Sequence, residues 1–194
     1  MKRSIPLGIL MLVAASFAAP RAKANATFTT TLSGANEVPA TLSTATGLAF
    51  VTLTFSTLDV TSFVFSGLTA PVTAATIQVA LPGVNGPVAI ILPGFPAATS
   101  GSYVMTFDLT LDGTYNTSFL TDNGGTAASA EAALMADMLA GKTYINIHDA
   151  NFPGGEIRGQ LSETQNVTPE PGTIVLLGTG LVSMLGAARR KWLS

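Results

Sequence analysis

The sequence contains no cysteine, a single histidine and few charged residues. Without cysteine the chain cannot form disulfides, thiolate metal sites or a cysteine nucleophile. A single histidine cannot supply a transition-metal site that is built on several imidazoles. The fold must therefore be held by its apolar core and its hydrogen bonds alone.

Basic residues are scarce in the middle of the chain. Residues 25–168 hold only two of the nine basic residues, Lys142 and Arg158, but ten of the eleven acidic residues, which gives this segment a net charge of −8. Such a segment repels phosphate backbones, so no nucleic-acid partner is expected. The simplest reason for the charge is solubility, and attraction of cations or basic partners is the alternative.

The N-terminus has the features of a secretion signal. Lys2 and Arg3 precede an uncharged apolar stretch over residues 5–19, and Ala22 and Ala24 stand two apart, as a signal peptidase requires. We predict that residues 1–24 form a signal peptide that is cleaved after Ala24. A permanent N-terminal anchor is the weaker alternative, because the apolar stretch is short for a membrane span.

The C-terminus carries the features of a second targeting signal. Pro169-Glu170-Pro171 is followed by residues 173–188 without a charge and then by Arg189-Arg190-Lys191. In this order the features resemble the PEP-CTERM sorting tail, which implies recognition and removal by an exosortase. We expect residues 169–194 to include a hydrophobic helix that holds the chain briefly in the inner membrane, with its basic end in the cytoplasm. A plain C-terminal membrane anchor is the alternative.

The middle of the chain alternates apolar and polar residues with the period of a β-strand. The alternation covers residues 46–58, 63–65, 77–79, 103–109, 144–148 and 156–161, and glycine, proline, asparagine and aspartate turns separate these runs. Only residues 129–140 favour a helix, which Gly141 would end. We predict one all-β domain over residues 25–168, an Ig-like or Greek-key β-sandwich with one short helix.

Four segments of this domain resemble the CHRD domain, the module named from chordin. They are residues 32–39 (LSGANEVP), 83–88 (GVNGPV), 144–148 (YINIH) and 151–161 (NFPGGEIRGQL). The resemblance implies an extracytoplasmic module rather than a particular activity. That family often carries a His-Ile-His triplet where this chain has Thr76-Ile77-Gln78, and neither Thr76 nor Gln78 can replace imidazole as a metal ligand.

Five residues form the candidate functional or structural cluster: Glu37, Asn146, His148, Glu156 and Arg158. His148 could act as a general base or a lone metal ligand, but it lacks an obvious partner, which favours a structural role. Glu156 and Arg158 stand two apart and should share a strand face. They can pair with each other or with a neighbour such as Glu37, and we expect an ion pair that clamps the last strand to the opening Asn36-Glu37-Val38 segment. No catalytic, cofactor-binding or metal-ligating residue is assigned.

These observations predict an exported, non-catalytic module of the outer membrane or extracellular matrix that binds a polysaccharide or a protein. Its processing partners would be signal peptidase and an exosortase, and only the terminal segments would contact a membrane. One alternative is an enzyme that acts on an extracellular polymer through His148 with Asp149 or Glu156. Another is an adhesive domain that binds calcium at turn carboxylates, for which the candidates are Asp108, Asp112, Asp122 and Asp149.

Overall fold

A computed structural model describes residues 25–164, and both predicted targeting signals lie outside this range. The strands form a single hydrogen-bonded sheet in the order β5-β4-β7-β8-β1-β2-β3-β6, and β9 pairs with β1. All pairings are antiparallel. The strands are β1 (Ala26–Ser33), β2 (Thr46–Leu53), β3 (Thr57–Ser66), β4 (Val72–Val79), β5 (Val88–Ile91), β6 (Gly101–Asp108), β7 (Thr143–Asp149), β8 (Ile157–Gln160) and β9 (Ser162–Glu163).

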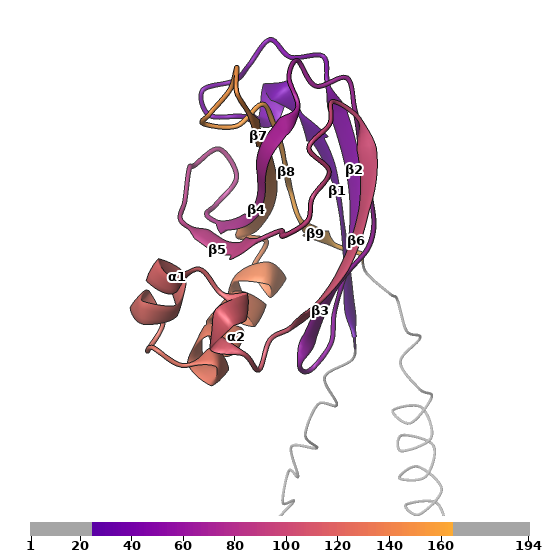
Figure 1. Cartoon of the computed structure of the whole chain (residues 1–194). Helices are drawn as coiled ribbons and strands as arrows, with labels where there is room; N and C mark the ends of the chain where they lie inside the picture. The colour runs from indigo at the N-terminus through magenta and orange to yellow at the C-terminus, as the bar shows by residue number, and fades with distance from the viewer. Residues whose placement is uncertain (1–24, 165–194) are drawn as a thin grey trace, which may run out of the picture.

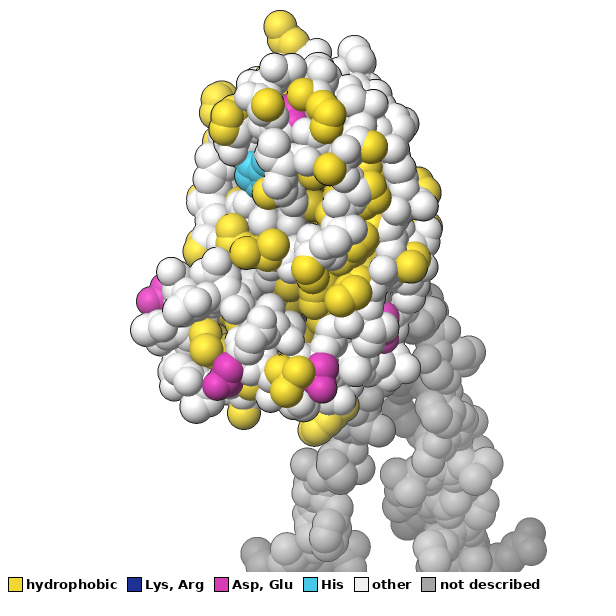
Figure 2. All heavy atoms as spheres, in the orientation of Figure 1, with side chains coloured by type: hydrophobic (Ala, Val, Ile, Leu, Met, Phe, Trp, Pro, Cys, Tyr) yellow, Lys and Arg dark blue, Asp and Glu magenta, His cyan; other side chains and the backbone are white. Residues whose placement is uncertain are grey.

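The sheet curls so that its two ends approach each other across the core (Figure 1). Its end strands, β5 and β6, leave an opening that residues 92–100 cover. In this segment Phe95 packs against Phe63, Phe65 and Tyr103, with ring centroids 4.9 to 5.1 Å apart. Figure 2 shows hydrophobic side chains gathered along the same opening. The covering segment therefore completes the core that the sheet leaves open.

Two helices follow β6 and lie at one end of the curled sheet (Figure 1). They are α1 (Thr117–Asp122) and α2 (Ala127–Leu139), and the side chains of Asn116 and Thr126 cap their first turns. Helix α2 buries Ala130, Leu134 and Met138 against the core. On the face seen in Figure 2, acidic side chains lie mainly over this helical end.

Alternation decides which side chains enter the core, with one interruption in β3. Leu58 and Val60 are buried, but Thr61 and Ser62 are both exposed before Phe63 becomes buried again. A bulge at this point inserts one residue into the strand and shifts the phase of the alternation. The apolar residues on both sides of the bulge therefore face the core.

Strand β8 packs unusually close to β1. A Cβ atom on Gly159 would overlap the hydroxyl of Thr30 and lie 2.5 Å from the carbonyl oxygen of Thr31. Glycine at this position lets β8 lie against β1, and this contact joins the two halves of the sheet.

The all-β, sandwich-like prediction is confirmed, although the two layers belong to one continuous sheet. The predicted helix over residues 129–140 corresponds to α2. Within residues 25–164, no helix is long and apolar enough to cross a membrane. The predicted signal peptide and C-terminal hydrophobic helix lie outside the described residues.

Candidate functional site

A row of polar side chains runs across the outer face of β4, β7 and β8. Asn146 of β7 lies opposite Thr76 of β4 on one side and Arg158 of β8 on the other, and Tyr144 lies opposite Gln78. The intervening β7 residues, Ile145 and Ile147, point into the core. The polar row is nevertheless buried, because loops fold back over this face.

Arg158 is the centre of this row and is only 4% exposed. Its Nε donates to the carbonyl oxygen of Asn36 at 2.5 Å, and its Nη1 donates to the side-chain oxygen of Asn85 at 2.9 Å. Nη1 also lies 3.3 Å from the carbonyl oxygen of Val84. The guanidinium lies 4.8 Å from the centre of the Tyr144 ring, within cation–π range. Arg158 therefore joins strand β8 to two loops at once.

Arg158 forms the expected ion pair with neither Glu156 nor Glu37, because its hydrogen-bond acceptors are the neutral oxygens of Asn36, Val84 and Asn85. Arg158 does bind the segment before Glu37, as the clamp prediction required, but through the backbone oxygen of Asn36. Asn36 completes the contact by donating its side-chain amide to the carbonyl oxygen of Arg158 at 3.1 Å. Glu156 precedes β8, and its carboxyl group turns toward other loops.

Glu37 lies close to Arg158 but is buried without a full set of partners. Its Oε1 and the side-chain oxygen of Asn146 have no hydrogen-bond partner among the described residues. Both atoms lie beside Gly155. Glu37 Oε1 is 2.6 Å and Asn146 Oδ1 is 2.5 Å from the point that a Cβ atom on this glycine would occupy. Burial raises the pKa of Glu37 to about 7, although the charge of Arg158 and the backbone of Val38 act in the opposite direction. A protonated Glu37 would supply the donor that these two acceptors lack.

A second part of the row links Tyr144, Gln78, Thr76 and His148. The Tyr144 hydroxyl donates to Gln78 Oε1 at 2.5 Å, and Gln78 Nε2 donates to the Thr76 hydroxyl at 3.0 Å. His148 Nδ1 lies 3.0 Å from the carbonyl oxygen of Pro153, and its Nε2 lies 3.5 Å from Gln78 Nε2. Thus the two positions that differ from the family's histidine pair, Thr76 and Gln78, lie beside the one histidine.

His148 is held in its neutral form by this arrangement. Burial lowers its pKa, which the hydrogen bond to Pro153 only partly offsets. Because Nδ1 donates to the Pro153 carbonyl, Nε2 is left as an acceptor that faces the amide of Gln78. Its hydrogen bonds hold the loop after β7, which is the structural role favoured from the sequence.

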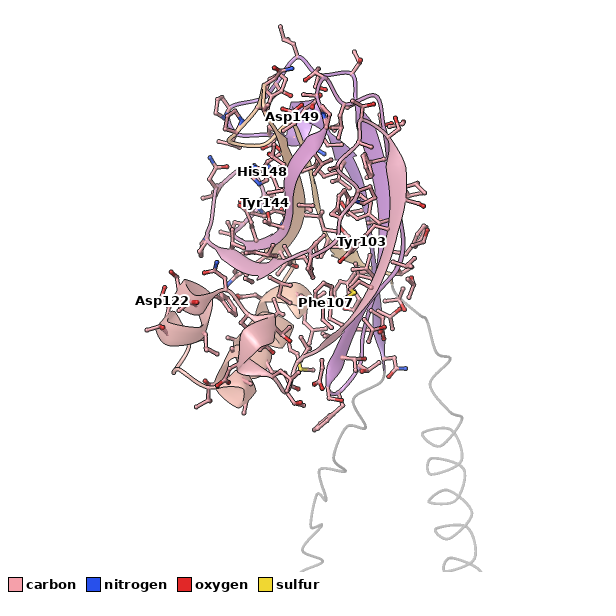
Figure 3. The ribbon with its side chains drawn as sticks, in the orientation of Figure 1. Tyr103, Phe107, Asp122, Tyr144, His148 and Asp149 are labelled. Carbon is pink, nitrogen blue, oxygen red and sulfur yellow. The ribbon has the colours of Figure 1, made fainter. Side chains whose placement is uncertain are left out.

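Asp149 and Glu156 form a buried carboxyl pair on the opposite face of β7 from His148. Asp149 accepts from the backbone of Ala70 at 2.9 Å and of Phe152 at 2.6 Å. Glu156 accepts from the Ser43 hydroxyl at 2.5 Å and from the backbone of Thr69 at 3.0 Å. Figure 3 shows Asp149, His148 and Tyr144 spaced along β7. The pair joins three loops that are distant in the sequence.

The pKa values of the two carboxyl groups are shifted in opposite directions. Burial would raise the pKa of Asp149, but hydrogen bonds from Glu156, Phe152, Thr69 and Ala70 lower it overall. Burial and the hydrogen bond with Asp149 raise the pKa of Glu156, against the donors Ser43 and Thr69. As the pH falls, Glu156 is therefore the member of the pair that takes up a proton first.

The carboxylates of the calcium alternative are spread over the domain. Asp108 accepts from the backbone and hydroxyl of Thr110, and these bonds lower its pKa. Asp112 accepts from the backbone of Ala127 at 2.6 Å, and Asp122 ends α1. No group of three histidine, aspartate or glutamate side chains within residues 25–164 could hold a metal ion. The calcium alternative stays a prediction without a preformed site.

Several partners of the cluster were missed in the sequence. Ser43 and Thr69 bind Glu156 from loops that carry no motif, so nothing in the sequence identifies them. Asn85 binds Arg158 and also donates to the carbonyl oxygen of Val38 at 2.7 Å. It stands in the GVNGPV segment that resembles the CHRD domain, and this was the one available signal.

Comparison with known families gives two matches. The model of the CHRD domain matches residues 28–161, and the model of the PEP-CTERM protein-sorting motif matches residues 167–191. No curated protein and no solved structure gives a significant match.

The first prediction concerns the Arg158 contacts. Replacement of Arg158 by alanine should lower the free energy of unfolding by roughly 2–4 kcal/mol, because buried carbonyl oxygens lose their donors. Urea unfolding followed by circular dichroism measures the change. Lys142→Ala, at the other cation of the domain, is the control and should have little effect. An unchanged melting temperature for Arg158→Ala would reject the clamp.

The second prediction follows from the raised pKa of Glu37, about 7 against 4.5 for the free group. A raised folded-state pKa contributes stability that is full below about pH 4.5 and is lost as the pH rises through 7. The free energy of unfolding of Glu37→Gln, measured against that of the native chain, should therefore be higher at pH 8 than at pH 5. The difference should be at most about 3 kcal/mol. Thermal melts at both pH values measure this difference, and the exposed Glu163→Gln is the control. Parallel pH profiles for Glu37→Gln and the native chain would contradict it.

The third prediction separates the two members of the carboxyl pair. Glu156→Gln should be tolerated, because glutamine resembles a neutral carboxyl that still donates to Asp149. Asp149→Asn should cost roughly 1–3 kcal/mol, because the donors around it lose a charged acceptor. Urea unfolding at pH 6 compares the two matched substitutions. Equal losses would contradict the assignment of Glu156 as the member of the pair that is protonated first.

Proposed function

The chain belongs to the CHRD domain family and carries a PEP-CTERM sorting motif, and from this premise we propose a non-catalytic matrix-binding function for it. The sorting motif indicates export, membrane-anchored sorting and processing by an exosortase. The mature domain would act at the outer membrane or in the extracellular matrix. There it would bind a polysaccharide or a protein.

The observation that carries the non-catalytic proposal is the use of the reactive side chains. His148, Asp149 and Glu156, which the enzyme alternative requires, each hold a loop through hydrogen bonds. His148 and Asp149 are consecutive residues of one strand, so they point to opposite faces of the sheet. A base and its partner would instead have to meet at one reacting atom. Neither matched family is known for an enzymatic activity.

Rigid presentation of a surface fits a binding module. The loops over the polar row are fixed to the sheet by Arg158 and Tyr144, so the domain presents a preformed face. The carboxyl pair fixes the loops on the other face of β7. A preformed face loses little conformational entropy on binding.

The fourth prediction tests this function. Beads that carry the full chain should retain a polysaccharide or protein from isolated extracellular matrix, and the retained polymer should keep its chain length. Size-exclusion chromatography of the eluate measures both properties. Beads that carry the thermally unfolded chain are the control. Retention equal to this control would contradict the binding function. If the polymer is shortened by the native chain but not by Asp149→Asn, the enzyme alternative is favoured.

A further inference from the structure

A hollow of about 370 Å³ opens on the outer face of the sheet beside Arg158. It lies where β1, β8 and β9 meet, and Pro82 and Gly83 of the β4–β5 loop form part of its rim. This volume is within the range of small-ligand sites. Its polar wall consists of Thr29, Thr31, Asn36, Arg158, Gln160 and Ser162.

Arg158 enters this hollow as a buried cation without a counter-ion in contact. Its partners are the neutral oxygens of Asn36, Val84 and Asn85 and the ring of Tyr144. Its Nη2 has no hydrogen-bond partner among the described residues. Glu37 acts on it only through the electrostatic field, and burial favours the neutral form of that acid. A buried charge is costly unless it is paired, so the guanidinium is prepared for an anion.

The remaining groups of the wall suit a hydroxylated ligand. Gln160 uses Nε2 to bind Ala80 and Gly141, which leaves its Oε1 as an acceptor. Asn36 likewise uses its Nδ2 and keeps Oδ1. The hydroxyls of Thr31 and Ser162 have no hydrogen-bond partner among residues 25–164. The hollow thus offers both donors and acceptors around one guanidinium, and no acidic side chain lines it.

From this arrangement we propose that the hollow binds a sugar residue bearing a carboxylate, with Arg158 Nη2 as its donor. The proposal rests on the proposed binding function and names its ligand class. A carboxylate is the planar acceptor that a guanidinium matches, and sugar hydroxyls match the surrounding hydroxyl and amide groups. An acidic peptide fits less well, because the wall holds no aromatic side chain for its apolar groups. The net charge of −8 further disfavours a densely charged polymer, so the carboxylates should be isolated along the glycan.

The fifth prediction uses two probes that differ only in the carboxylate. Saturation-transfer NMR on the full chain, in a detergent without sugar groups, should show binding of methyl glucuronide and at least fivefold weaker binding of methyl glucoside. Thr31→Trp should abolish the glucuronide signal, because an exposed strand position accepts tryptophan but the indole fills the hollow. Thr106→Trp, on an exposed position of β6, is the matched control and should keep the signal. Glu37→Gln should strengthen binding at pH 8, because the one acid that acts on Arg158 becomes neutral.

Three outcomes would overturn the proposal. They are equal signals from the two sugars, no signal from the glucuronide, or a glucuronide signal that Thr31→Trp leaves unchanged in a folded chain. Stronger competition by an acetylated aspartate tripeptide than by the glucuronide would assign the hollow to peptides instead. If the beads still retain a matrix polymer while the glucuronide fails to bind, the binding function stands and only this site is rejected.

Discussion

The structure depends on one buried guanidinium. Residues 25–168 contain two cations, and one of them, Arg158, is placed where β8, the segment before Glu37 and the β4–β5 loop meet. A lysine could not replace it, because the fork of guanidinium donors satisfies oxygens in several directions at once. Both segments that Arg158 contacts lie more than seventy residues before it in the chain. Its contacts therefore fix the positions of both loops relative to β8.

The buried acids of the domain are accommodated by shifts in their pKa values. Residues 25–168 hold ten acids and two bases, which would give a domain of unpaired carboxylates if all acids were ionised inside it. Instead burial raises the pKa of Glu37 to about 7, and within the carboxyl pair the pKa of Glu156 is raised while that of Asp149 is lowered. Neutral carboxyls both donate and accept, so they can join loops without a counter-ion. The remaining acids lie mostly on the surface, where charge maintains solubility.

Much of the fold could be predicted from the sequence, but less of the site. Alternation identified the strands whose apolar residues face one side, and alanine, leucine and methionine identified α2. Strand β1 was missed because threonine occupies four of its eight positions, β5 because its sequence VAII does not alternate, and α1 because its helix is set by the Asn116 cap. Alternation also placed Glu156 and Arg158 on one face, but β8 begins at Ile157 and Glu156 belongs to the preceding turn. Its partners Ser43 and Thr69 approach from distant loops, which no local pattern can predict.

The absence of cysteine explains why so many polar groups are committed to structure. Exported domains commonly fix their loops with disulfides, and this chain has none. Its loops are instead held by Arg158, His148, Asp149 and Glu156, and the last three are also groups that general acid–base chemistry would need. A side chain that holds a loop through buried hydrogen bonds is not free to reorient toward a substrate or to exchange protons without loosening the fold. The same residues therefore serve stability, and the Arg158 donor that no residue between 25 and 164 uses, Nη2, is where we propose that a ligand binds.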